Sequence, residues 1–124
     1  MIKPARYDIS FIRGDTPSWK CQLTHISDSG TRTVVDLGKG QLINGQVRYN
    51  TESLEVLYKL PIEVIDAKNG IFKWRIDKNA SESLLPPGSS LSDQAVYDIQ
   101  LTMGTSVQTI INGSFSIVRD VTRV

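Results

Sequence analysis

The chain has 124 residues, the size of one domain that can bury a core without disulfides or metal ions. With 40% apolar and 22% charged residues, the composition is that of a globular protein rather than a disordered one. A formal net charge of +1, without basic runs, argues against nucleic acid or a membrane surface as partner.

Two further sequence features limit where the protein is made and what it can bind. Cys21 is the only cysteine, which excludes an intramolecular disulfide and a thiolate metal cluster. The first eight residues lack the apolar stretch of a signal peptide, and no segment approaches the roughly 20 apolar residues that span a bilayer. We therefore expect synthesis in a cytoplasm.

Apolar and polar residues alternate with a period of two along most of the chain, which predicts β-strands. Each pattern would place one face on a core and the other in water, as antiparallel sheets require. The patterns lie, in chain order, at 7–12, 19–24, 54–62, 72–76, 95–103 and 107–118. The aromatic side chains expected in the core are Trp19, Trp74, Tyr97 and Phe115.

Residues that favour turns separate these patterns. Asn69-Gly70 lies between two strong strand patterns and predicts a hairpin. Asn44-Gly45 suits a tight turn or a bulge, and Asn112-Gly113 interrupts the last pattern, where a bulge and a turn are equally expected. The segments 28–30 and 104–106 predict two more tight connections.

One short helical turn is expected near 80–85. Asn79 is its predicted N-cap, Glu82 stands where a capping box needs it, and Pro86 ends the helix. Together with the strand patterns, this turn predicts an all-β fold. We expect an immunoglobulin-like antiparallel β-sandwich of about seven to eight strands, in a single domain over residues 1–124.

Tyr97 stands early in a late strand, where immunoglobulin domains carry a tyrosine corner. In such a corner the phenol hydroxyl bonds to backbone of the preceding loop. We therefore expect the Tyr97 hydroxyl to bond to backbone between about Leu85 and Leu91.

The residues that could support catalysis do not form a recognisable arrangement. His25 is the only histidine, and on one strand it would lie about 13 Å from Cys21, so we predict a surface histidine and a core cysteine. The acidic residues considered for glycoside hydrolysis fall on polar strand faces or in turns: Glu55, Glu63, Asp66, Asp77 and Asp98. We predict a protein that is not an enzyme and has no cofactor.

Two short motifs have structural and functional interpretations. Arg13-Gly14-Asp15 is a tripeptide that adhesion receptors read, but its position predicts a strand-ending bend in which Arg13 and Asp15 can pair locally. The segments 28–30 and 36–38 are too poor in oxygen ligands for a calcium loop of the EF-hand type, and a weak single-ion site is left as an alternative.

Six short segments spread along nearly the whole chain form a recognisable set: Phe11–Thr16, Val35–Gly38, Leu85–Gly88, Tyr97–Asp98, Gly113–Ile117 and Asp120–Arg123. Together they resemble a family of small structural proteins of tailed phages. The chain is similar to the N-terminal baseplate-attachment domain of phage receptor-binding and upper-baseplate proteins. The resemblance implies an immunoglobulin-like fold in a virion, without catalytic activity.

This chain also departs from the family pattern in two places. The loop 86–95 is longer and richer in serine, and the segment 50–62 is apolar on both faces around Leu57. We expect these two places to be contact surfaces peculiar to this protein.

The expected function is that of a non-enzymatic virion protein that joins tail, baseplate or fibre components in many copies. Its partners would be other virion proteins, with no nucleic acid, membrane or small-molecule substrate. Chain termini are easily donated to neighbours, so the two terminal arms are the expected contact segments. The expected partner-binding residues are Arg6, Tyr7, Arg119, Asp120, Val121, Thr122 and Arg123.

Two alternative functions remain. A capsid decoration protein would use the same kind of domain outside a shell lattice. A carbohydrate-binding module belongs to another class and would need exposed aromatic rings, such as Trp19 and Trp74 on one face.

Overall fold

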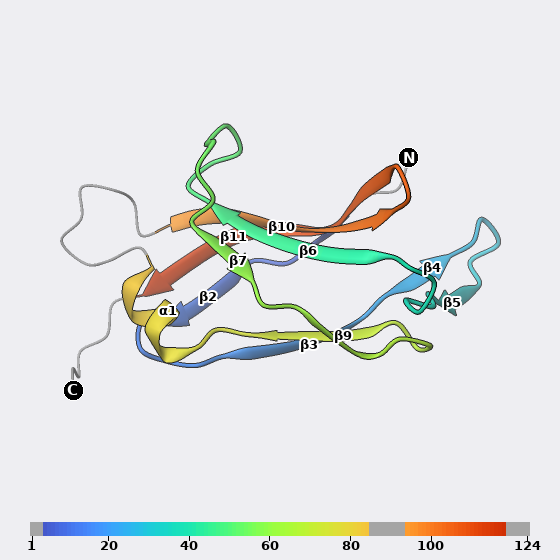
Figure 1. Cartoon of the computed structure of the whole chain (residues 1–124), viewed down its shortest axis with the longest axis horizontal. Coiled ribbons are helices and arrows are strands. Elements are labelled where there is room, and N and C mark those ends of the chain that lie inside the picture. Colours follow the sequence, from blue (N-terminus) through green and yellow to red (C-terminus); the bar gives the residue numbers. More distant parts are fainter. Residues whose placement is uncertain (1–3, 85–93, 119–124) are drawn as a thin grey trace.

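A computed structural model describes residues 4–84 and 94–118. These residues form an all-β sandwich with one short helix, and Figure 1 shows two layers of strands facing each other. The larger sheet has the order β1-β11-β10-β6-β7, with β2 also paired to β11. Its strands are β1 (Ala5–Arg6), β2 (Ile9–Ile12), β6 (Leu42–Arg48), β7 (Tyr58–Leu60), β10 (Gln94–Met103) and β11 (Ser106–Val118).

The second layer is a three-stranded sheet of order β3-β9-β8. It contains β3 (Ser18–Gln22), β8 (Glu63–Asp66) and β9 (Ile71–Arg75), while β4 (Thr24–Ile26) and β5 (Arg32–Val34) form a separate ribbon. The core lies between the layers, where Trp74, Tyr97 and Phe115 are all buried as predicted. Trp19 is half-buried and stacks on Trp74, with 5.6 Å between ring centroids.

The pairing of the N-terminal strands differs from the antiparallel arrangement that we predicted. Both β1 and β2 run parallel to β11, with Ala5 opposite Ile111 and Ile9 opposite Phe115. The predicted strand at 7–12 is also interrupted, since Tyr7 and Asp8 lie between β1 and β2. The N-terminal segment therefore forms an edge of the larger sheet in two pieces.

The bulge in β11 lies two residues before Asn112, where the predicted position begins. Ile99 pairs with Ile111 and Gln100 pairs with Thr109, so Ile110 is the extra residue. The bulge brings the adjacent side chains of Ile110 and Ile111 into contact with the same core. Asn112-Gly113 is neither a turn nor the bulge, because β11 continues through it.

Two other predictions about strands and turns are wrong. Asn44-Gly45 lies inside β6, where a Cβ on Gly45 would come within 2.7 Å of the Leu60 side chain. The long pattern at 54–62 gives a strand only over β7, and Leu54 is 95% exposed. At Gly45 the local pattern was overridden by packing between neighbouring strands.

The predicted tight connections are confirmed. Gly70 (φ +68°) ends the turn between β8 and β9, and Gly30 (φ +86°) lies between β4 and β5. Gly104 (φ +58°) begins the two-residue loop between β10 and β11. Each glycine adopts a positive φ angle that other residues rarely take.

The helix α1 (Lys78–Ser83) begins earlier than predicted, and its N-cap is different. Asp77 caps the helix, with its carboxylate accepting a hydrogen bond of 2.8 Å from the Ala80 amide, while Asn79 lies inside the first turn. A carboxylate is a better cap here because it also interacts favourably with the positive end of the helix dipole. The chain leaves the helix at Leu84, and Pro86 lies outside the described residues.

β2 ends at Ile12 and the chain bends at Arg13-Gly14, as predicted, but the Arg13 side chain turns into the protein. Its side chain is only 6% exposed and donates hydrogen bonds to the Glu82 and Leu84 carbonyls, at 3.0 and 3.1 Å. The next residue, Gly14, donates its amide to the buried Ser81 hydroxyl at 2.8 Å. These bonds satisfy carbonyls at the end of α1 and fix the helix to the end of β2.

Candidate functional site

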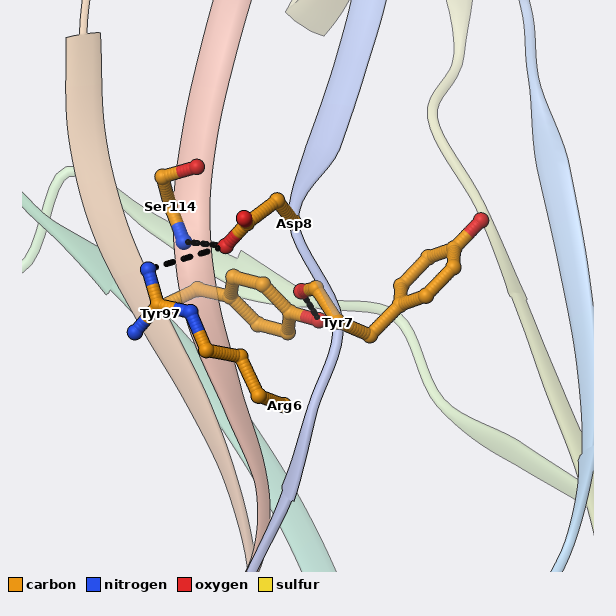
Figure 2. A network of polar contacts seen from close by, with 5 residues as sticks. All are labelled: Arg6, Tyr7, Asp8, Tyr97 and Ser114. Atoms are coloured by element: carbon orange, nitrogen blue, oxygen red, sulfur yellow. Dashed lines mark hydrogen bonds and ion pairs between the residues drawn. The ribbon is translucent and has the colours of Figure 1, made fainter.

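The N-terminal edge of the larger sheet is anchored by polar contacts on both sides of β11 (Figure 2). The Tyr97 hydroxyl donates a hydrogen bond to the Tyr7 carbonyl, 90 residues away in sequence. The Asp8 carboxylate accepts a 2.9 Å bond from the Ser114 amide and lies 3.1 Å from the Arg6 guanidinium. The predicted tyrosine corner is therefore wrong, because Tyr97 bonds to the N-terminal segment rather than to the loop before β10.

Gly113 allows the N-terminal segment to come this close to β11. A Cβ at position 113 would lie 2.1 Å from the Tyr7 carbonyl oxygen, closer than any real contact allows. The neighbouring Tyr7 amide donates to the Asn112 carbonyl at 2.9 Å. The sequence Asn112-Gly113 is thus explained by a close approach between backbones.

The pKa values of Asp8 and Tyr97 are shifted from their ordinary values by different causes. The Ser114 amide bond lowers the pKa of Asp8 below its ordinary value, against a smaller opposing effect of burial. Burial raises the pKa of Tyr97 well above that of a free tyrosine, with smaller contributions from nearby groups such as Cys21. The anchor therefore combines an ionised Asp8 with a neutral Tyr97 phenol.

Two of the seven predicted partner-binding residues lie on this anchored edge. The Arg6 side chain is 70% exposed, and Tyr7 is 49% exposed. Trp19 donates a hydrogen bond from its indole N–H to the Tyr7 hydroxyl at 3.2 Å. The Tyr7 ring is therefore fixed in position although it is exposed to solvent. The other five predicted residues, Arg119 to Arg123, lie outside the described residues.

A groove of about 530 Å³, lined mostly by polar residues, occupies the outer face of the larger sheet, next to this edge. We call it the outer-face groove. Strand register places side chains from four strands in one row across its floor, because Gln46 faces Asp98, Asp98 faces Asn112, and Asn112 faces Arg6. Its lining includes Arg6, Asn44, Gln46, Arg48, Asp98 and Asn112.

One wall of the outer-face groove is the connection between β6 and β7, which includes the lining residue Asn50 and projects outward from the sheet in Figure 1. Arg48 holds this connection in place. Its guanidinium donates to the Ser53 and Leu54 carbonyls at 2.8 Å each, and to the Gln46 side chain at 3.0 Å. The wall is therefore formed before any ligand binds.

Asp98 is the only acidic side chain among the described lining residues. It is half-buried, and burial raises its pKa, while nearby Arg48 and a hydrogen bond to Gln100 act in the opposite direction. The groove thus places a carboxylate at its centre, between amide and guanidinium groups.

The residues considered for catalysis remain apart. His25 is exposed on β4, as predicted, and Cys21 is half-buried against the core, where burial raises its pKa. Among residues 4–84 and 94–118, no group of three or more His, Cys, Asp or Glu side chains could hold a metal ion. In the same ranges, no helix is long and apolar enough to cross a membrane.

No protein-family model and no curated protein matches the chain.

From the sequence, Asp98 was considered only as a carboxylate for glycoside hydrolysis, for which no catalytic arrangement was found. The other residues of the groove floor were not predicted as part of a site. The available signal was a run of alternate polar residues on two strands: Asn44, Gln46 and Arg48, then Asp98 and Gln100. Such a run also describes any solvated sheet face, and the pairing of β6 with β10 was needed to bring the two runs together.

Proposed function

We propose that this protein is a non-enzymatic structural protein of a phage virion, joining tail, baseplate or fibre components through the N-terminal edge of its larger sheet. The observation that carries the proposal is the anchored display of Arg6 and Tyr7, which are exposed while their backbone is fixed to β11. A pre-organised edge loses little conformational entropy when a partner binds.

The backbone of this edge supports the same proposal. β1 and β2 pair with β11 on one side, and on the other side they have no strand partner among the described residues. A partner can add a strand to such an edge by main-chain hydrogen bonds. Ile12 and Val118 are opposite each other in register and both about half-exposed, so they offer an apolar contact beside it.

The phage assignment and the immunoglobulin-like connectivity belong to this proposal. They are supported by the sequence resemblance and by the sandwich of two β layers. A capsid decoration protein could use the same edge. The carbohydrate module based on stacked aromatic rings loses support, because Trp74 is only 1% exposed and cannot form a platform with Trp19.

The test compares incorporation of variants into purified virions from a complemented host. The double variant Arg6→Ala/Tyr7→Ala changes side chains at the edge, and truncation before Arg119 removes the expected C-terminal contact segment. Both should fold as soluble monomers and fail to enter particles. Lys20→Ala, an exposed change on β3 in the other sheet, is the control and should be incorporated normally. Normal incorporation of the double variant and of the truncated chain would refute the proposal.

A further inference from the structure

The outer-face groove differs from an ordinary solvated sheet face in its hydrogen-bonding capacity. Its side-chain amides both donate and accept hydrogen bonds. Asn44 and Asn112 have no side-chain hydrogen-bond partner among the described residues, so their amides are available to a ligand. The amide residues in the lining are Asn44, Gln46, Asn50, Gln100 and Asn112.

The charges of the groove select against a strongly ionic ligand. Arg6 is paired with Asp8 at 3.1 Å, and the Arg48 guanidinium is occupied by two carbonyls and by Gln46. An anion would also meet the Asp98 carboxylate at the centre of the floor. A cation would meet Asp98 but would have both arginines on the same lining.

Apolar ligands are also disfavoured. Val96 is the only aliphatic side chain among the described lining residues. Tyr97 is the only aromatic one, and it is buried, with its hydroxyl committed to the Tyr7 carbonyl. The described lining thus offers many hydrogen-bonding groups, but neither an exposed aromatic ring nor a cluster of aliphatic side chains on which an apolar ligand could pack.

We propose that the outer-face groove binds a neutral carbohydrate through the row Gln46, Asp98, Asn112. Sugar hydroxyls donate and accept, so they match both the amides and the carboxylate, which can accept two hydroxyl hydrogens. The fixed wall held by Arg48 limits the reorganisation needed on binding. Binding at one site without aromatic stacking is weak, and a multi-copy particle would strengthen it through avidity.

This site lies on the face of the sheet, and it does not depend on the proposed attachment by the sheet edge. The experiment is an NMR titration of the isotopically labelled full chain with maltohexaose, cellohexaose and chitohexaose. We expect saturable shifts of groove amides with at least one of the three, at a Kd of about 1 mM. Inorganic phosphate and an acidic hexapeptide are the ionic comparison probes.

Matched variants decide whether the groove is the site. Gln46→Ala removes an amide from the floor, and Asp98→Asn replaces one acceptor oxygen of the carboxylate with an NH2 donor and removes the negative charge that strengthens bonds from sugar hydroxyls. Each should weaken binding by about tenfold. Glu63→Gln makes the same chemical change as Asp98→Asn on exposed β8 in the other sheet and should leave the Kd unchanged. Unchanged amide spectra away from the substitution show that each variant is folded.

Three results would overturn the proposal. The first is the absence of saturation with all three oligosaccharides, and the second is binding that Asp98→Asn and Gln46→Ala leave intact. The third is displacement of the sugar by phosphate or by the acidic peptide at the same residues, which would make the groove an anion or protein-docking site. Arg6 lines both the groove and the sheet edge. The two proposals are therefore separated by Asp98→Asn and Gln46→Ala, which change the groove floor away from the edge and should leave virion incorporation normal while they weaken sugar binding.

Discussion

Replacing Gly113 with alanine should release the N-terminal edge from β11. The new Cβ would come within 2.1 Å of the Tyr7 carbonyl oxygen, and backbone cannot move away without breaking its bonds. Three hydrogen bonds depend on this approach: Tyr97 hydroxyl to Tyr7 carbonyl, Tyr7 amide to Asn112 carbonyl, and Ser114 amide to Asp8. At about 1 kcal/mol each, their loss should cost about 3 kcal/mol of unfolding free energy.

Part of this cost is offset, since alanine reduces the conformational freedom of the unfolded chain by about 0.4–1 kcal/mol. We therefore expect Gly113→Ala to lower stability by about 2–3 kcal/mol, which shifts the Tm by about 10 °C in a domain of this size. The assay is thermal and urea unfolding followed by circular dichroism. Gly38→Ala is the matched control, because its neighbours are the Asp36 side chain at 3.1 Å and the Ala67 methyl at 3.7 Å. It should change stability by less than about 0.5 kcal/mol.

A double-mutant cycle locates the effect. Tyr97→Phe alone should cost about 1 kcal/mol by removing the bond to the Tyr7 carbonyl. In the Gly113→Ala background it should cost almost nothing, because that bond is already broken. Full additivity of the two substitutions, or a Gly113→Ala variant as stable as Gly38→Ala, would refute the close approach of Tyr7 to β11.

The remaining predictions concern the helix cap and two titrating groups. Asp77→Ala should destabilise the protein by about 1 kcal/mol in urea unfolding, and Asn79→Ala by much less, since Asp77 is the N-cap; the reverse order would contradict the cap assignment. Because the pKa of Asp8 is lowered in the folded state, the stability that its ionised carboxylate contributes should be lost as the pH falls below 3.8. Asp8→Asn should reduce this acid dependence of stability. An acid transition identical to that of the unchanged protein would contradict the role of Asp8. The raised pKa of Tyr97 should make folding less favourable as the pH rises above 10, because the phenol ionises more readily in the unfolded chain. Tyr97→Phe should weaken this loss of stability, measured by ultraviolet titration and by unfolding at alkaline pH. The same alkaline unfolding midpoint in both proteins would argue against a buried phenol.

Local patterns predicted the all-β class, most of the core and three tight connections. Alternation identified Trp74, Tyr97 and Phe115 as buried, and Gly30, Gly70 and Gly104 mark turns that require positive φ angles. These features depend on a few neighbouring residues. They are therefore readable from a single sequence.

Features that depend on distant pairing could not be predicted in the same way. Asn112-Gly113 has the same sequence as a common hairpin turn. Its glycine is needed for a different reason, because the Tyr7 backbone, from the other end of the chain, packs directly against Gly113. The sequence predicts Arg13 at a strand-ending bend where it can pair with Asp15, but the Glu82 and Leu84 carbonyls of the distant α1 segment hold its side chain inside the protein. The groove likewise required the register between β6 and β10.

The most direct test of the proposed function is a map of the assembled particle at a resolution that shows side chains. The account predicts that this chain is present in the tail, baseplate or fibre region, with a neighbouring protein seated against the β1–β2 edge and in contact with Arg6 and Tyr7. A particle that lacks the chain, or one in which this edge faces solvent in every copy, would contradict it.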